Sequence, residues 1–403
     1  MGWIKNVRLE TGRQVTSKGD KVTITKPFSI LVENGLIQEI TEQLPENVSE
    51  VVDARNYLAL PSLKDQHIHL DKGHYGGAWH AVVPMNGVAD RIKEEEGFLI
   101  DFLKDTPKKA QALIDLITGK GATFLRVQVN VDPVSELKYL YLIQEVLEKN
   151  RHKLDYELVV FPQHGTLATE KLGLLSKALE VDGVGVLGGL DPASIDQDIE
   201  KSLTTTFRLA KKYNKEIDIH LHDGGSLGIF QINRIIDYTL AEKMEGKVQI
   251  SHAFSLADIE GTQLDTVLHG LKTAGIAINT TVPIDIKALP IPDLLKHGVK
   301  VHVINDNIND HWSPFGTGDL VERASRAAEV FSMTDEVSLS KALGLITKGV
   351  TPLDESDRQV WPKVGDPADF LFTKSESSAH LIGRVCEERV VFFKGKQVSG
   401  KFY

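Results

Sequence analysis

The stretch Gln66-His67-Ile68-His69-Leu70-Asp71-Lys72 directly follows an apolar run that begins at Tyr57. On a β-strand, residues two positions apart point to the same face, so the imidazoles of His67 and His69 are expected on one side. Two neutral imidazoles on one side supply half of a metal site. An isolated His-x-His pair is more often just two polar residues at a strand end. The interpretation therefore depends on whether further ligands follow other strands.

Composition limits the classes of function. Of the 403 residues, 41% are hydrophobic and 25% are charged, which is typical of soluble globular proteins. The net charge of −10 argues against a nucleic-acid partner. The single cysteine, Cys386, excludes an internal disulfide and thiolate clusters. No signal-peptide pattern and no membrane-spanning apolar run is present, so we expect a cytoplasmic protein without a membrane partner. We also expect the protein to form a homo-oligomer.

Short β-branched runs occupy both ends of the chain. The runs lie at 22–25, 28–32, 36–40, 51–54, 365–372 and 388–396. Asn34-Gly35, between two of them, indicates a type I′ hairpin turn. Because the termini of a domain commonly lie close together, we predict a small β-sandwich domain built from residues 1–57 and 355–403.

Between residues 58 and 354, short apolar runs alternate with helical patterns. In the stretch 196–211, for example, apolar residues recur every three to four positions from Ile199 to Ala210. Eight strands alternating with helices over roughly 250 residues predict a (β/α)8 TIM barrel. An open doubly wound sheet is the alternative, but no Gly-x-Gly-x-x-Gly follows an early strand. The predicted strands are 58–69, 122–129, 157–163, 184–189, 216–222, 248–252, 276–280 and 299–306.

The C-terminal strand ends of such a barrel carry its chemistry. At these ends the sequence places His67, His69, His220 and Asp306, which supply three nitrogens and one oxygen. This donor set fits an open site for one divalent metal ion, zinc or alternatively iron, with a position left for water. The long loop from Gly73 to about Phe98 is positioned to cover the barrel mouth.

Other polar residues share these ends, and each also has a purely structural interpretation. His252 could be a buried core histidine, Gln163 a strand-end cap, and His222 a residue that merely lines the site. Asp71 and Lys72 could form a solvated pair. The fourth strand ends Gly188-Gly189-Leu190-Asp191 and offers no lysine for a carbamate bridge, which favours one metal over two.

Together these segments resemble the amidohydrolase superfamily and, within it, the cytosine deaminase branch. The stretches 219–234 and 306–316 are most similar to the N-isopropylammelide isopropylaminohydrolase family, which acts on triazine rings. The resemblance covers nearly the whole chain, including the terminal β domain. The matching segments are 67–72, 161–163, 188–192, 220–223, 251–253 and 305–316.

The resemblance implies roles for individual residues. It implies His67, His69, His220 and Asp306 as metal ligands or near-ligands. It implies His252 with Asp306 as the catalytic pair that handles the proton of water, and Gln163 as a contact to a heterocyclic substrate.

Two positions depart from the pattern of cytosine deaminases. Asp223 stands where those enzymes have a longer glutamate general acid, and Asn307 stands where they have a second aspartate. Both departures count against cytosine itself, because a neutral amide both donates and accepts hydrogen bonds.

The residues predict hydrolysis of a C–N bond that releases ammonia or a small alkylamine from an aminopyrimidine, aminotriazine or similar ring. Asp223, His222 or Lys72 would protonate the leaving amine, and the choice stays open. The polar residues expected to bind the substrate are Gln163, His222, Lys72, Asn307 and Trp312. The alternatives are a metal-dependent hydrolase of a cyclic amide or lactone, cytosine deaminase proper, and a non-catalytic metal-binding barrel.

Overall fold

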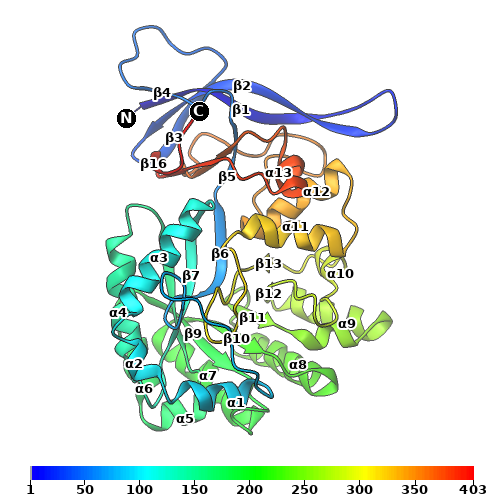
Figure 1. The fold of residues 1–403 in the computed structure, drawn as a ribbon. Helices are drawn as coiled ribbons and strands as arrows, with labels where there is room; N and C mark the ends of the chain where they lie inside the picture. Colours follow the sequence, from blue (N-terminus) through cyan, green and yellow to red (C-terminus); the bar gives the residue numbers. More distant parts are fainter. Residues whose placement is uncertain (1) are drawn as a thin grey trace.

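The computed structural model describes residues 2–403 and contains two units, a barrel and a terminal sheet that lies at one end of it (Figure 1). Sequence neighbours are also neighbours in the barrel, whose strand order runs without interruption from β6 to β13. All of these strand pairs are parallel. The barrel strands are β6 (Leu63–His69), β7 (Ala122–Asn130), β8 (Asp155–Phe161), β9 (Val184–Leu190), β10 (Glu216–Leu221), β11 (Val248–His252), β12 (Ala277–Thr280) and β13 (Val301–Val303).

The seam between the last and first strands closes just beyond β13. The backbone N–H of Asp306 donates to the carbonyl of His67 at 3.0 Å, and the N–H of His69 donates to the carbonyl of Asp306 at 3.3 Å. A parallel bridge between Ile68 and Asp306 accompanies these bonds. The prediction of a (β/α)8 barrel is confirmed.

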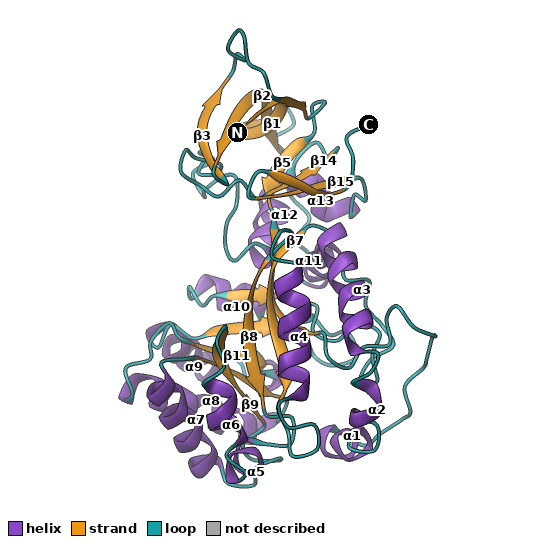
Figure 2. Cartoon of the chain, turned by 90° about the vertical axis from the view of Figure 1, so that its left-hand side faces the viewer, coloured by secondary structure: helices purple, strands orange, loops and turns teal. Residues whose placement is uncertain are grey.

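Helices surround the barrel (Figure 2). One buried apolar cluster fills the space between these helices and the strands. In α7 the buried face carries Leu203, Phe207 and Ala210, as the periodicity predicts. This helix begins at Ile199, because the carboxylate of Asp198 caps it by accepting from the N–H of Lys201. The helices of the barrel layer are α3 (Thr106–Gly119), α4 (Lys138–Lys149), α5 (Thr166–Lys171), α6 (Leu174–Leu179), α7 (Ile199–Tyr213), α8 (Gly225–Ala241), α9 (Gly261–Thr273), α10 (Ile291–Lys296) and α11 (Leu320–Val330).

Strands from both chain ends form the second unit, in the order β16-β15-β14-β5-β1-β2-β3 with β4 beside β1. The predicted Asn34-Gly35 hairpin joins β2 and β3, and both of its residues have positive φ angles, 52° and 79°. The strands are β1 (Gly2–Val15), β2 (Lys21–Glu33), β3 (Leu36–Thr41), β4 (Val51–Asp53), β5 (Leu58–Pro61), β14 (Phe370–Thr373), β15 (Arg389–Phe393) and β16 (Lys396–Ser399).

The predicted sandwich takes the form of one continuous sheet that folds over its own core. Ile30 of β2 and the paired residues Phe370 and Phe392 of β14 and β15 belong to one buried cluster, although β2 lies three places from β14 in the sheet order. The edge strand β3 also returns to the far side, where the N–H of Ala368 donates to the carbonyl of Gly35 at 2.8 Å. The terminal domain therefore has its own apolar core, separate from that of the barrel.

One predicted strand is corrected. The stretch 58–69 is two strands, because Pro61 has no N–H to continue a ladder and the chain changes sheet at Ser62. Strand β5 pairs antiparallel with β14 in the terminal sheet, whereas β6 begins the barrel. The terminal sheet thus extends past residue 57, where the sequence placed its end.

Two helices, α12 (Glu336–Leu343) and α13 (Ser378–Arg384), lie between the barrel and the terminal sheet (Figure 1). Among residues 2–403, no helix has the length and apolar character that crossing a membrane requires.

Candidate active site

Four predicted ligands converge at the barrel mouth. His67 and His69 end β6, His220 lies near the end of β10, and Asp306 follows β13. The Nε2 atoms of His67 and His69 each lie 3.3 Å from Oδ1 of Asp306. The Nε2 of His220 lies 3.4 Å from the Nε2 of His69. One possible ligand atom from each residue lies within 4.8 Å of all the others.

These separations fit a bound metal ion. Tetrahedral coordination at about 2.0–2.2 Å places neighbouring ligand atoms roughly 3.3–3.6 Å apart. The Nε2 of His67 and the Oδ1 of Asp306 are buried and have no hydrogen-bond partner, a costly arrangement that a cation would relieve. Within residues 2–403 this is the one such group of ligands, which agrees with a single metal site.

The electrostatics of the site favour positive charge between the ligands. Burial opposes the charged form of His67, but Asp218 and Asp306 outweigh it and raise the pKa of His67 to about 9. Burial likewise opposes the charge of Asp306, yet the imidazoles of His67 and His69, 3.3 Å from its Oδ1, hold the pKa of Asp306 well below its usual range. A divalent cation would supply the positive charge that these groups favour.

A second layer, not predicted from the sequence, holds His67. Its Nδ1 lies 2.8 Å from Oγ of Ser251 and 3.1 Å from Nε2 of Gln128. Both partners also donate to Asp218, at 2.7 Å and 3.1 Å. Such partners fix the orientation of a ligating imidazole. Each of these residues points inward from a neighbouring strand, one layer below the ligands.

The backbone turns sharply where the site residues emerge. His252, Asp306 and Asp191 have φ angles of 73°, 60° and 34°. Positive φ is costly for residues other than glycine, and such strain concentrates at functional sites. At these three positions the surrounding barrel holds a conformation that the free chain would avoid.

The predicted residues His252 and His222 stack beside the ligands, with ring centroids 4.3 Å apart. Burial, followed by the charge of His222, keeps the pKa of His252 well below its usual value. Asp191 orients His222, since its Oδ2 lies 2.8 Å from Nδ1 of His222 and its Oδ1 accepts from the backbone N–H of His222 at 2.6 Å. A proton on Nδ1 that points to Asp191 leaves Nε2 of His222 available to other partners.

A buried ionic cluster lies on the opposite wall. Lys72 donates to Oε1 of Gln163 at 2.7 Å and lies 3.1 Å from Oε1 of Glu95. Glu95 also accepts from Trp312 Nε1 at 3.1 Å and contacts Nε2 of His311 at 2.9 Å. Burial opposes the charge of Glu95, but Lys72 and His311 outweigh it and hold the pKa of Glu95 below its usual range. The bond from Lys72 also turns the Gln163 amide, so that its NH2 group remains free.

Asn307 and Trp312 line the same space, as predicted. The amide of Asn307 donates to Oδ2 of Asp310, and Oδ1 of Asp310 accepts from the backbone N–H of Trp312 at 2.8 Å. Because the NH2 group of Asn307 is bonded to Asp310, its carbonyl oxygen is the group left to face a ligand.

Asp223 is the predicted residue that the structure keeps out of this space. Its Oδ2 accepts from Nε2 of Gln231 in α8 at 2.9 Å, and it does not line the cavity beside the ligands. His222, by contrast, does line it. The two residues differ because successive residues after β10 point in different directions.

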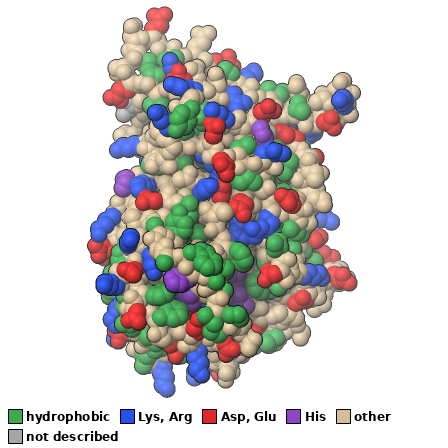
Figure 3. Space-filling view, in the orientation of Figure 1, with side chains coloured by type: hydrophobic (Ala, Val, Ile, Leu, Met, Phe, Trp, Pro, Cys, Tyr) green, Lys and Arg blue, Asp and Glu red, His purple; other side chains and the backbone are tan. Residues whose placement is uncertain are grey.

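The cavity beside the ligands has a volume of about 30 Å³, near the space that one water molecule occupies. Its cover is α1 (Val88–Glu95), which lies in the loop expected over the mouth. Ile92 of α1 packs on Phe161 and Leu190, whereas Trp79 stays exposed. Figure 3 shows histidine side chains in the lower half of this face, among hydrophobic ones. The residues lining the cavity include His69, Lys72, Val88, Gln163, His220, His222, His252, Asp306, Asn307 and Trp312.

Comparison with known proteins shows where the chain belongs. Residues 112–377 match the model of the amidohydrolase family. The chain is 37% identical over 403 residues to the uncharacterized protein YahJ of Escherichia coli (strain K12), covering 99% of this chain and 87% of that protein. It is 28% identical over 379 residues to N-isopropylammelide isopropyl amidohydrolase of Pseudomonas sp. (strain ADP), covering 88% and 93%.

A solved structure supports the same assignment. The crystal structure of N-isopropylammelide isopropylaminohydrolase from Burkholderia multivorans ATCC 17616 matches with a TM-score of 0.86 at 29% identity, over 99% of each chain. Fold and site together define a barrel hydrolase with a buried cluster of three histidines and one aspartate that could bind a divalent metal. The chain belongs to the amidohydrolase family. The stated resemblance is confirmed, as is the expectation of an enzyme, a hydrolase of C–N bonds other than peptide bonds.

Proposed function

We propose that this enzyme hydrolyses the bond between a ring carbon and an exocyclic nitrogen of a nitrogen heterocycle, releasing ammonia or a small alkylamine. The observation that carries the proposal is the convergence of His67, His69, His220 and Asp306 beside His252, in a cavity lined by neutral amides. The relatives named for action on N-isopropylammelide support the same class of bond.

The proposed cofactor is one divalent metal ion held by His67, His69, His220 and Asp306, with zinc preferred and iron the alternative. When bound, such an ion lowers the pKa of water from near 16 towards about 7 and makes hydroxide available at neutral pH. Three imidazoles and a carboxylate are suitable donors for zinc.

The residues around the ligands transfer the proton of water and bind the ring. Asp306 keeps 15% of its side chain exposed and takes the proton from the attacking water, while His252 polarises the oxygen that adds to the ring. Gln163 presents its NH2 group to a ring oxygen or nitrogen, and Asn307 presents its carbonyl to a ring N–H. These amides hold the ring in the plane that the attack requires.

The leaving amine requires a proton, and the geometry favours His222 as its source. Asp191 fixes Nδ1 of His222, so Nε2 is the atom available at the cavity. Asp223 is bonded to Gln231 away from the cavity, and Lys72 is bonded to Gln163 and Glu95. Of the three candidates, His222 alone lines the cavity without an ion pair to a buried glutamate.

The cavity volume of about 30 Å³ does not accommodate a six-membered ring. We therefore expect α1, whose Val88 lines this cavity, or the side chain of Trp312 to shift when a heterocycle binds. A movable cover that excludes water is then part of the proposed enzyme.

The test is release of ammonia or alkylamine from a panel of aminopyrimidines, hydroxylated aminotriazines and pterins, using metal-loaded protein. We expect turnover of at least one ring with an exocyclic amine, and loss of that turnover in His252→Asn. Turnover of cyclic amides or lactones, with no amine released, would favour the alternative hydrolase. Efficient turnover of cytosine alone would favour cytosine deaminase proper.

The cytoplasm is the proposed compartment of this enzyme. That the protein forms a homo-oligomer stays a prediction.

A further inference from the structure

A second cavity lies at the opposite end of the barrel from the metal ligands. Its volume is about 1000 Å³, and the first residues of four barrel strands line it: Glu216, Val248, Ala277 and Val301. Residues of β1, α12 and α13 line its other side, so it lies between the barrel and the terminal domain. Nothing in the proposed reaction uses this space.

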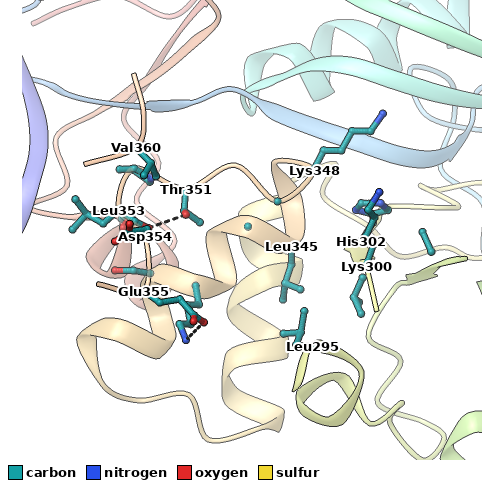
Figure 4. Close-up of a pocket in the computed structure, with 18 of the residues that line it drawn as sticks. Leu295, Lys300, His302, Leu345, Lys348, Thr351, Leu353, Asp354, Glu355 and Val360 are labelled. Carbon is teal, nitrogen blue, oxygen red and sulfur yellow. Dashed lines mark hydrogen bonds and ion pairs between the residues drawn. The ribbon is translucent and has the colours of Figure 1, made fainter. Parts of the chain in front are cut away.

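One side of the cavity is basic. Lys300 and His302 lie two positions apart and therefore on the same face, and Lys348 lies close to them (Figure 4). Both lysines are exposed, and neither forms an ion pair with a carboxylate within residues 2–403.

Two buried side chains, Arg126 and His302, also line this part of the cavity. Arg126 is 1% exposed and pairs with Glu157 and Glu216, but its Nη1 atom has no partner. Burial, followed by the charges of Lys348, Arg126 and Lys300, lowers the pKa of His302 to about 3. At neutral pH, His302 is therefore an uncharged imidazole that donates one N–H.

The neighbouring wall is apolar. Leu295 and Leu345 point towards each other in the middle of the opening, between the basic residues and the segment that carries Asp354 and Glu355 (Figure 4). Leu295 is 41% exposed. The carboxylates of Asp354 and Glu355 already form ion pairs, Asp354 with Arg358 and Glu355 with Lys341. Within residues 2–403, the exposed unpaired charges of the lining, those of Lys300 and Lys348 among them, are therefore positive and lie beside an apolar surface. Glu10, a lining carboxyl without an ion pair in this range, is buried.

We infer that this cavity binds a small phosphomonoester, with its phosphate held by Lys300, Lys348 and His302 and its apolar body placed against Leu295 and Leu345. A phosphomonoester carries about −1.5 to −2 charges at pH 7, which matches two unpaired ammonium groups better than a carboxylate does. Lysine is an effective point charge for phosphate, and the neutral imidazole supplies a third donor. The site is independent of the proposed reaction.

Calorimetric titration of the full-length, metal-loaded protein tests this site. The probes are phenyl phosphate, inorganic phosphate and benzoate, all at one ionic strength. We expect phenyl phosphate to bind more tightly than either other probe, because only it combines the dianion with an apolar ring. Lys300→Gln and Lys348→Gln should each weaken its binding about tenfold, as loss of one charge-assisted hydrogen bond implies. Lys171→Gln, a charge change on α5 outside the cavity, should leave it unchanged.

A second variant separates the two halves of the site. Leu295→Asn should weaken binding of phenyl phosphate several-fold and leave inorganic phosphate unaffected. Thermal unfolding checks that each variant is folded, which exposed substitutions should permit.

Three results would overturn the inference. The first is no binding of phenyl phosphate to the wild type at millimolar concentration. The second is unchanged binding in a Lys300→Gln/Lys348→Gln double variant, which would put the anion elsewhere, for example at the metal ligands. The third is equal affinity for inorganic phosphate or benzoate, which would remove the organic phosphate as the ligand.

Discussion

The Nζ atom of Lys72 lies 3.1 Å from Oε1 of Glu95, and both side chains are completely buried. Lys72 follows a barrel strand, whereas Glu95 ends the helix that covers the barrel mouth. The pair therefore fixes the cover to the catalytic wall. Through the bond from Lys72 to Gln163, it also sets the orientation of a proposed substrate contact.

Replacing Glu95 by Gln should leave the charge of Lys72 buried and unpaired. Loss of one partner from a buried ion pair costs about 3–5 kcal/mol of unfolding free energy. We also expect KM for the substrate to rise, because Gln163 loses its fixed orientation. Chemical denaturation and steady-state kinetics measure the two effects.

Glu94→Gln is the matched control, because Glu94 pairs with Arg91 at the partly exposed edge of the same helix. It should change the unfolding free energy by less than about 1 kcal/mol. Equal effects of the two substitutions would contradict a special role for Glu95.

The metal site predicts a stoichiometry. Protein purified without chelator should carry about one equivalent of divalent metal per chain, and the ligand residues should be folded around it. His69→Asn should lower the metal content strongly, whereas His80→Asn, in the loop over the mouth, should not. Elemental analysis for zinc and iron gives the answer, and a folded chain that cannot be loaded with either ion would refute the site.

Asp191 should act through His222. In Asp191→Asn the amide can donate to Nδ1, so His222 loses its fixed tautomer and its orientation. We expect kcat to fall about 100-fold or more while the metal content stays the same. Asp196→Asn provides the control, because Asp196 caps α5 and bonds Ser202 away from the cavity. A wild-type kcat in Asp191→Asn would exclude the proposed role of His222.

Asn307 should influence which ring is accepted. Asn307→Asp replaces a donor to Asp310 by a second carboxylate, so the two acids repel and the neutral acceptor that faces the ligand becomes a charged one. The ratio of kcat/KM for cytosine to that for hydroxylated aminotriazines should rise at least tenfold. Asn309→Asp makes the same chemical change outside the cavity lining and should leave the ratio as it is. An unchanged ratio in Asn307→Asp would show that other residues select the ring.

The lowered pKa of His302 predicts that the stability of the fold depends on pH. Its folded pKa of about 3 lies below the ordinary value of 6.5, so the unfolded chain binds a proton that the folded chain does not bind between these values. Stability should therefore fall as the pH drops from about 6.5 towards 3, by up to roughly 1.4 kcal/mol per pH unit from this group. His302→Gln should flatten the slope, and the exposed His152→Gln should not. Denaturation curves at several pH values provide the comparison.

The sequence predicts the parts of the site that follow from strand period and strand ends. His67 and His69 share a face because they are two residues apart, and parallel strands bring His220 and Asp306 to the same rim. The barrel follows from the same alternation of strands and helices. These features are local, so a single sequence contains them.

Other parts depend on the folded chain and leave no local signal. Glu95 lies 23 positions after Lys72, and only the return of α1 over the mouth joins them. Asp223 has the expected spacing from His220, yet Gln231 on the next helix binds its carboxylate. The division of 58–69 at Ser62 depends on β14, which is contributed by the other end of the chain.

Because the barrel closes at Asp306, the ligand set is completed late in the synthesis of the chain. The first ligands lie on β6, and the carboxylate that completes the set arrives only after β13, bonded to the backbone of His67 and His69. During synthesis, the nascent chain therefore cannot contain all four proposed ligands until just over three quarters of it has been made. A cleaved or prematurely terminated chain that lacks the last strand would keep three imidazoles but no catalytic carboxylate. Such partial chains are therefore expected to be inactive.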